Sequence, residues 1–102
     1  MNGIPAIEKS SRHPKITGDF GEHLTLYALS KHGFECARID HTGMDIIARH
    51  PHTTELMGIS VKSRSRDEKR ANATMNVRGY NFKKLADACV AFGCKPYFSL
   101  VI

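Results

Sequence analysis

The 102-residue chain has the length of one domain, which excludes a TIM barrel or an enzyme built from two domains. Hydrophobic residues make up 41% of the chain and charged residues 25%, which excludes a mostly disordered protein. The 15 Lys and Arg residues outnumber the 10 Asp and Glu residues, so the formal charge is +5. This balance favours an acidic partner without naming one.

Three cysteines, without the spacing of a disulfide scaffold, indicate a reducing compartment. Cys89 and Cys94 flank an expected helix end, but no further pair of zinc ligands accompanies them, so buried thiols are the simpler interpretation. No apolar run reaches the ~20 residues of a membrane span, and the N-terminus lacks a signal-peptide pattern. We therefore expect a cytoplasmic protein that does not enter a membrane.

The predicted elements follow the order αβββαβ. Residues 1–15 contain two prolines and show no periodicity, which predicts an irregular arm before a single domain over residues 16–102. The first helix is predicted over Thr17–His32, with Gly33 as its C-terminal stop. Three strands are predicted next, over Glu35–Ile39, Met44–Arg49 and Leu56–Ser63. A polar loop over Asp67–Gly79, a second helix over Asn81–Phe92 and a last strand over Tyr97–Ile102 follow.

Apolar rows predict how the two helices pack. The first helix has one row of Phe20, Leu24, Tyr27 and Ala28, and a second row of Leu26 and Leu29 that we expect to dock on the sheet. On the second helix, Asn81 is the expected N-cap, and the apolar face consists of Phe82, Leu85, Ala86, Cys89 and Val90.

The second and third strands are predicted to form a hairpin. If its turn centres on Thr53–Thr54, Asp45 lies opposite Lys62 and Ile47 lies opposite Ser60, all on one mixed face. The other face then carries an apolar set for the core, namely Met44, Ile46, Ala48, Ile59 and Val61.

The positive charge is concentrated in one stretch. Eight basic and two acidic residues lie between Lys62 and Lys84, a net charge of +6, whereas the rest of the chain carries 7 basic and 8 acidic residues. Such a zone suits a phosphate backbone, because each neutralised phosphate releases counterions, although a solvated loop would have the same composition. The candidate nucleic-acid contacts are Ser63, Arg64, Arg66, Lys69, Arg70, Arg78, Lys83 and Lys84, with Tyr80 and Phe82 as candidates for base stacking.

Two carboxylates and a lysine suggest the chemistry. Glu22 shares the docking row with Leu26 and Leu29, so this helix face presents one carboxylate, which would also favour the helix N-terminus electrostatically. Together with Asp45 and Lys62 on adjacent strands, it suits metal-assisted hydrolysis of a phosphodiester, because Mg²⁺ prefers oxygen ligands and activates a bound water. The lysine would orient the water or stabilise the transition state; a cross-strand ion pair is the structural alternative.

The stretches Gly18–Glu22, Gly43–Ile47 and Ile59–Ser63 resemble the PD-(D/E)xK nuclease superfamily, and look most similar to archaeal Holliday-junction resolvases and small restriction-type endonucleases. The resemblance covers roughly residues 15–102 and implies a restriction-endonuclease-like α/β fold, with a mixed central sheet flanked by helices. It also implies DNA as partner, a homodimer, and Mg²⁺ or Mn²⁺ as cofactor. The implied site residues are the metal ligands Glu22 and Asp45 and the catalytic Lys62.

Ser60 departs from the family pattern, which has Glu or Asp as a metal ligand two residues before the lysine. A neutral hydroxyl is a poorer ligand, so we expect weaker metal binding and keep Ser60 in the candidate catalytic set. Three functions remain open: a metal-dependent endonuclease acting on DNA, including branched or foreign DNA, a catalytically impaired nucleic-acid-binding module on the same fold, and a protein-interaction domain with structural acids.

Overall fold

The computed structural model describes residues 8–63 and 79–102, and the elements found there confirm the predicted order αβββαβ. They are α1 (His13–Lys31), β1 (Glu35–Arg38), β2 (Ile46–Arg49), β3 (Leu56–Ser63), α2 (Gly79–Phe92) and β4 (Lys95–Val101). The predicted loop up to residue 78, the side chain of Tyr80, and five candidate nucleic-acid contacts lie outside the described residues; these contacts are Arg64, Arg66, Lys69, Arg70 and Arg78.

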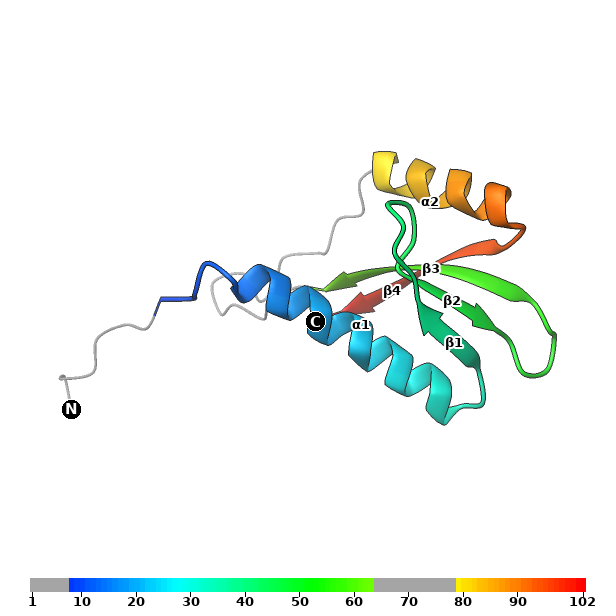
Figure 1. Cartoon of the computed structure of the whole chain (residues 1–102), viewed down its shortest axis with the longest axis horizontal. Helices are drawn as coiled ribbons and strands as arrows, with labels where there is room; N and C mark the ends of the chain where they lie inside the picture. Colours follow the sequence, from blue (N-terminus) through cyan, green and yellow to red (C-terminus); the bar gives the residue numbers. More distant parts are fainter. Residues whose placement is uncertain (1–7, 64–78) are drawn as a thin grey trace.

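The four strands form one mixed sheet in the order β1-β2-β3-β4. β1 pairs antiparallel with β2 and β2 antiparallel with β3, whereas β4 runs parallel to β3 after the connection that includes α2. Figure 1 shows α1 and α2 on opposite faces of this sheet. The predicted α/β class, with a mixed sheet flanked by helices, is confirmed. Neither helix of the described ranges is long and apolar enough to cross a membrane.

Both helices begin earlier than predicted. α1 begins at His13 rather than Thr17 and contains Pro14 in its first turn, where the missing proline N–H removes no helical hydrogen bond. α2 begins at Gly79, so Asn81 lies inside the helix and is not its N-cap. The predicted starts were wrong because the segment before Thr17 lacks an apolar periodicity, although proline is common in a first helical turn, and because Asn81 was interpreted as an N-cap.

The two helices end in the same backbone motif, at glycines with positive φ. Gly33 has a φ of +88° and Gly93 a φ of +70°, which glycine adopts without strain. In each case the residue after the glycine donates its N–H back to the last helical turn, from Phe34 to the Leu29 carbonyl at 3.0 Å and from Cys94 to the Cys89 carbonyl at 2.9 Å. This Schellman motif places the two side chains of each pair against each other.

The hairpin register differs by two residues from the predicted one. Ile47 pairs with Gly58, and continuing this register places Asp45 opposite Ser60 rather than Lys62. Because side chains alternate with a period of two, a shift of two residues leaves the side chains within β2 and β3 on their predicted faces.

The turn between β2 and β3 explains the shift. The ring nitrogen Nδ1 of His50 accepts hydrogen bonds from the backbone N–H groups of His52 and Thr53, at 3.1 and 3.2 Å. Thr54 adopts the left-handed conformation with a φ of 60°, and its N–H donates to the His50 carbonyl at 3.1 Å. The turn therefore centres one residue earlier than predicted, between His52 and Thr53.

The sheet separates two apolar layers. The layer against α1 contains the buried side chains of Ile46, Ala48 and Ile59, packed by Leu26, Leu29, Phe34, Cys36, Met57 and Val61. The layer against α2 contains Met44, Leu85, Ala88 and Cys89, packed by Ile39, Cys94 and Phe98. The predicted apolar set is confirmed except for Met44, which precedes β2 and therefore does not follow the alternation of that strand.

The predicted helix faces are confirmed only in part. Leu26 and Leu29 pack on the sheet as expected, whereas the other α1 row (Phe20, Leu24, Tyr27 and Ala28) is exposed. On α2, Phe82 is 55% and Val90 84% exposed, so their assignment to the core face was wrong. Leu85, Ala88 and Cys89 cover the sheet at helical spacing, whereas Phe82 lies beside Phe98 at the margin and Val90 faces solvent.

The β1–β2 loop approaches α2 (Figure 1), and Gly43 lies at the close contact. A Cβ atom at Gly43 would lie 2.6 Å from the Lys84 carbonyl oxygen and 2.7 Å from the Ala88 Cβ. Both neighbours belong to the helix and move only if the loop and α2 separate. Glycine at this position therefore keeps the loop, including the residues just before β2, in contact with α2.

We predict that Gly43→Ala lowers the free energy of unfolding by about 1–3 kcal/mol, because the added methyl group overpacks this contact. Urea denaturation measures the change. Gly18→Ala is the matched control: a Cβ at Gly18 meets nothing within 4 Å, and the substitution should stabilise α1 by roughly 0.5–1 kcal/mol. Equal effects of the two substitutions would contradict the close approach at Gly43.

Candidate active site

Asp45 is fixed against β3 just before β2 begins. Its backbone N–H donates to the Ile59 carbonyl at 2.8 Å, and its carboxylate oxygen Oδ2 accepts the backbone N–H of Val61 at 2.7 Å. Val61 lies between Ser60 and Lys62 in the chain. The hydrogen bond therefore holds the Asp45 carboxylate beside the two β3 residues that the sequence singled out.

Ser60 and Lys62 lie on the face of β3 that is turned toward α2. Gly58, two residues earlier, contacts sulfur atoms of the α2 layer, whereas Ser63 contacts α1 at Gly21, so the alternation assigns the faces. Ser60 is buried, with 7% of its surface exposed. Lys62 is half-buried, and within the described residues its ammonium group has no hydrogen bond or ion pair.

Glu22 lies on the α1 face of the sheet, paired with an arginine of β1. Arg38 Nε lies 3.0 Å from Glu22 Oε1, and Arg38 Nη2 lies 3.8 Å from Asp19 Oδ1. Arg38 opposes Ile46 in the sheet, and Ile46 belongs to the layer against α1. The guanidinium group therefore neutralises the helix carboxylate that was predicted to bind metal.

Sequence reasoning missed Arg38 as part of this region. The available signal was the pair of carboxylates on α1, Asp19 and Glu22, which are three residues apart and so lie on one side of the helix. A basic residue on the neighbouring strand is the natural partner of such a pair. That β1 places Arg38 there depends on how α1 crosses the sheet, which no local pattern shows.

The structure brings some of the predicted site residues together and not others. Asp45 joins the segment of Ser60 and Lys62 through the Val61 N–H. No hydrogen bond or ion pair connects Glu22 with Asp45 or Lys62, and the described segments contain no group of three His, Cys, Asp or Glu side chains placed to hold a metal ion. The donors are hard carboxylate and hydroxyl oxygens, which fit Mg²⁺ or Mn²⁺ in kind.

Three of the candidate nucleic-acid contacts are described by the structure: Ser63 lies against α1, and Lys83 and Lys84 lie on α2. Ser63 is half-buried and contacts α1 at Gly21. Lys83 forms an exposed ion pair with Asp87 at 2.7 Å, and its pKa is raised by the hydrogen bond to that carboxylate and by its charge. Lys84 lines a hollow of about 280 Å³ between α2 and the loop residues His41, Thr42 and Gly43. The loop that leads to Asp45 thus lies beside Lys84.

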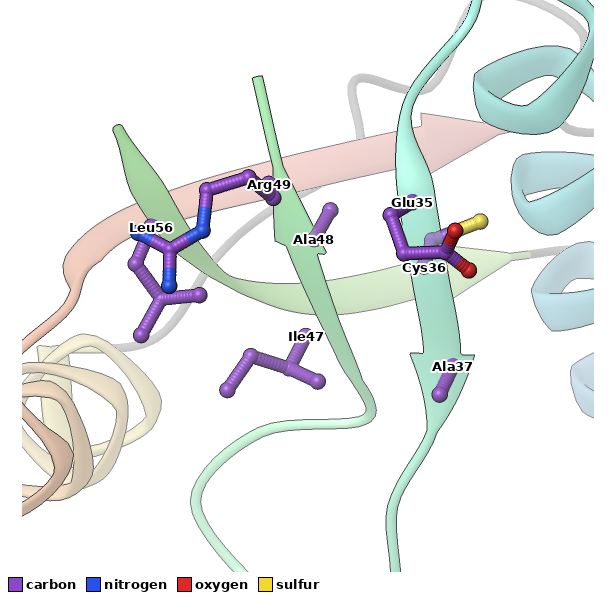
Figure 2. A pocket seen from close by; sticks show the side chains of 7 residues that line it. All are labelled: Glu35, Cys36, Ala37, Ile47, Ala48, Arg49 and Leu56. Atoms are coloured by element: carbon purple, nitrogen blue, oxygen red, sulfur yellow. The ribbon is translucent and has the colours of Figure 1, made fainter. Parts of the chain in front are cut away.

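A second hollow, of about 250 Å³, lies on β1 and β2 (Figure 2). Its lining consists of Glu35, Cys36, Ala37, Ile47, Ala48, Arg49 and Leu56. Arg49 and Glu35 oppose each other in the sheet, and the Arg49 guanidinium also donates to the Thr54 carbonyl at 2.8 Å. None of the predicted site residues lines this hollow, so it does not mark the reaction centre.

The Val61–Asp45 hydrogen bond predicts a difference between two substitutions of Asp45. Asp45→Ala leaves the partly buried Val61 N–H without its acceptor and should lower the free energy of unfolding by roughly 1–3 kcal/mol. Asp45→Asn retains an acceptor oxygen and should cost less than about 1 kcal/mol. Urea denaturation of the two variants measures this difference, and equal stabilities would show that the hydrogen bond contributes nothing. Asp45→Asn is therefore the suitable variant for tests of activity.

Comparison with solved structures is informative about the fold. No model of a protein family and no curated protein matches this chain. Among solved structures, Hjc of Archaeoglobus fulgidus, a Holliday junction resolvase from an archaeal hyperthermophile, is similar to it with a TM-score of 0.64 and 23% sequence identity. The match covers 82% of this chain and 64% of Hjc, so the chain spans less than two thirds of that protein. This likeness shows that the chain has a restriction-endonuclease-like fold.

Proposed function

We propose that this chain is a metal-dependent endonuclease domain that hydrolyses phosphodiester bonds in DNA, with Asp45 and Lys62 at its reaction centre. The observation that supports this most directly is the 2.7 Å hydrogen bond from the Val61 N–H to Asp45 Oδ2, which holds a carboxylate at the residue before Lys62 in β3. The fold shared with a Holliday junction resolvase supports a nuclease and makes branched DNA the first substrate to test.

Mg²⁺ or Mn²⁺ is the cofactor of this proposal, held by carboxylate oxygens of Asp45 and Glu22. The bound cation would activate a water and neutralise charge on the phosphate. Asp45 is already oriented, because one of its oxygens is bound to β3 and the other accepts no hydrogen bond from the described residues. To bind the cation, Glu22 would have to leave its ion pair with Arg38. Lys62 acts as a point charge on the phosphate or holds the attacking water through its ammonium group.

A second candidate function is a DNA-binding module that cuts poorly or not at all. Ser60 supports this second function. It is buried and uncharged and lies directly opposite Asp45 in the sheet. The nuclease superfamily that the sequence resembles has Glu or Asp at this position. The ion pair of Glu22 with Arg38 supports it too, since that carboxylate is already neutralised. Basic residues such as Lys84 would then bind phosphates without subsequent hydrolysis.

The proposal also includes a cytoplasmic location and a homodimer. Cys36, Cys89 and Cys94 are free thiols, as expected in a reducing compartment. A domain of this size buries a limited core, so association with a second copy would add stability.

We predict that the reduced full chain cleaves a four-way DNA junction in Mg²⁺ or Mn²⁺ at low salt, and that Lys62→Ala and Asp45→Asn each lower the rate at least about 100-fold. The rate is measured with labelled junction and with a linear duplex of the same sequence. Lys95→Ala is the matched control: Lys95 pairs with Glu55 and lies beside Met57, at the end of the sheet away from Lys62. Cleavage that survives both site substitutions, in variants with unchanged circular dichroism, would contradict the assignment.

Replacing Ser60 separates the two candidate functions. We expect Ser60→Asp, which adds a third carboxylate across from Asp45, to raise cleavage at least about tenfold by improving metal binding. Ser60→Glu is measured in parallel, because the Asp and Glu side chains differ in length and one of them will fit this buried position better. Salt-sensitive DNA binding by the wild type and by both folded variants, without cleavage in either metal, would favour the binding module instead.

A further inference from the structure

Three sulfur atoms converge on Gly58, in the α2 layer of the core. A Cβ atom at Gly58 would lie 2.5 Å from Cys89 Sγ, 2.8 Å from Cys94 Sγ and 2.9 Å from Met44 Sδ. The three side chains come from α2, from the residue just before β4 and from the β1–β2 loop. They surround the one position of β3 in this layer where a side chain is absent.

The helix motif explains only part of this arrangement. The Schellman motif at Gly93 sets Cys94 against Cys89, as it sets Phe34 against Leu29 after α1. It does not account for the third sulfur atom, which belongs to Met44, nor for a glycine at the facing position of β3. The cluster therefore results from three separate parts of the chain.

The cluster is buried except for one accessible member. Met44 and Cys89 are each 1% exposed, whereas Cys94 is half-buried and lies at the end of the layer. The Cys89 thiol is the donor in a long contact of 3.9 Å with the Gly58 carbonyl, and burial raises the pKa of this thiol to about 12. A ligand would reach the buried sulfur atoms past Cys94.

We propose that Met44, Cys89 and Cys94 form a binding site for one soft monovalent cation, Cu(I). Thiolate and thioether sulfur select Cu(I), whereas a closed zinc site takes four ligands and rarely includes a thioether. On binding, two S–H bonds break, both protons go to solvent, and two thiolates and the thioether coordinate Cu(I) without any change of oxidation state. The complex carries one net negative charge.

Occupancy of this site would join the parts of the chain that surround the candidate active site. The cation would tie α2 and the residue just before β4 to Met44, and Met44 immediately precedes Asp45 in the chain. The inference does not depend on the proposed nuclease activity, because its evidence and its test involve only sulfur ligands.

The test is an anaerobic titration of the reduced full chain with Cu(I) held by the chromophoric chelator bathocuproine disulfonate. We expect one Cu(I) per chain to be withdrawn from the chelator, and Cys94→Ser and Met44→Leu each to weaken binding at least about tenfold. Met44→Leu conserves the core volume, so this variant should stay folded. Cys36→Ser is the matched control, because Cys36 packs in the opposite layer against α1, and its Cu(I) affinity should equal that of the wild type.

Several results would overturn the site. The first is that the chelator retains its Cu(I). The second is that Cys36→Ser weakens Cu(I) binding as much as Cys94→Ser does. The third is that Met44→Leu binds Cu(I) with wild-type affinity. X-ray absorption at the copper edge should show sulfur neighbours alone, and nitrogen or oxygen neighbours would contradict the assignment.

Discussion

The burial of both faces of β3 is the constraint on which the rest of the structure depends. Ile59 and Val61 pack toward α1, whereas Gly58 and Ser60 are turned toward α2. Neither face can therefore carry a charge in the middle of the strand unless that charge is paired. Lys62 lies near the end of β3, where the covering layers finish, and this is where charged chemistry is compatible with the fold.

The same constraint shapes the candidate site. Because the hairpin register places Asp45 opposite Ser60, Asp45 does not pair with Lys62 across the sheet, and its carboxylate accepts the backbone N–H of Val61. Ser60, the only buried polar residue that the structure describes on β3, is small enough to pack beneath α2. A carboxylate at this buried position would lose its hydration, which is unfavourable unless a cation is bound beside it. Serine carries no charge and therefore avoids this desolvation cost when no metal ion is bound.

Much of this was predictable because periodicity is a local property. The element order, the bounds of β3 and the docking row of Leu26 and Leu29 followed from the sequence. The hairpin register was wrong by two residues, yet the assignment of faces survived because the error was even. Two assignments to a face failed for different reasons. Met44 is buried, but it precedes β2 and packs in the opposite layer. Val90 is exposed, because no element of the described residues covers its side of α2.

The sequence by itself determined the class of fold, the strand that carries Ser60 and Lys62, and the oxygen donors near them. These features depend on side-chain chemistry and on the alternation of neighbouring residues, which are local properties of the chain. Only the tertiary structure decided that Arg38 neutralises Glu22, that Asp45 binds β3 through Val61, and that three sulfur atoms meet at Gly58. Each of these contacts joins segments far apart in the chain. Their geometry is set by how closely α1 and α2 approach the sheet, which is a property of packing and not of any local pattern.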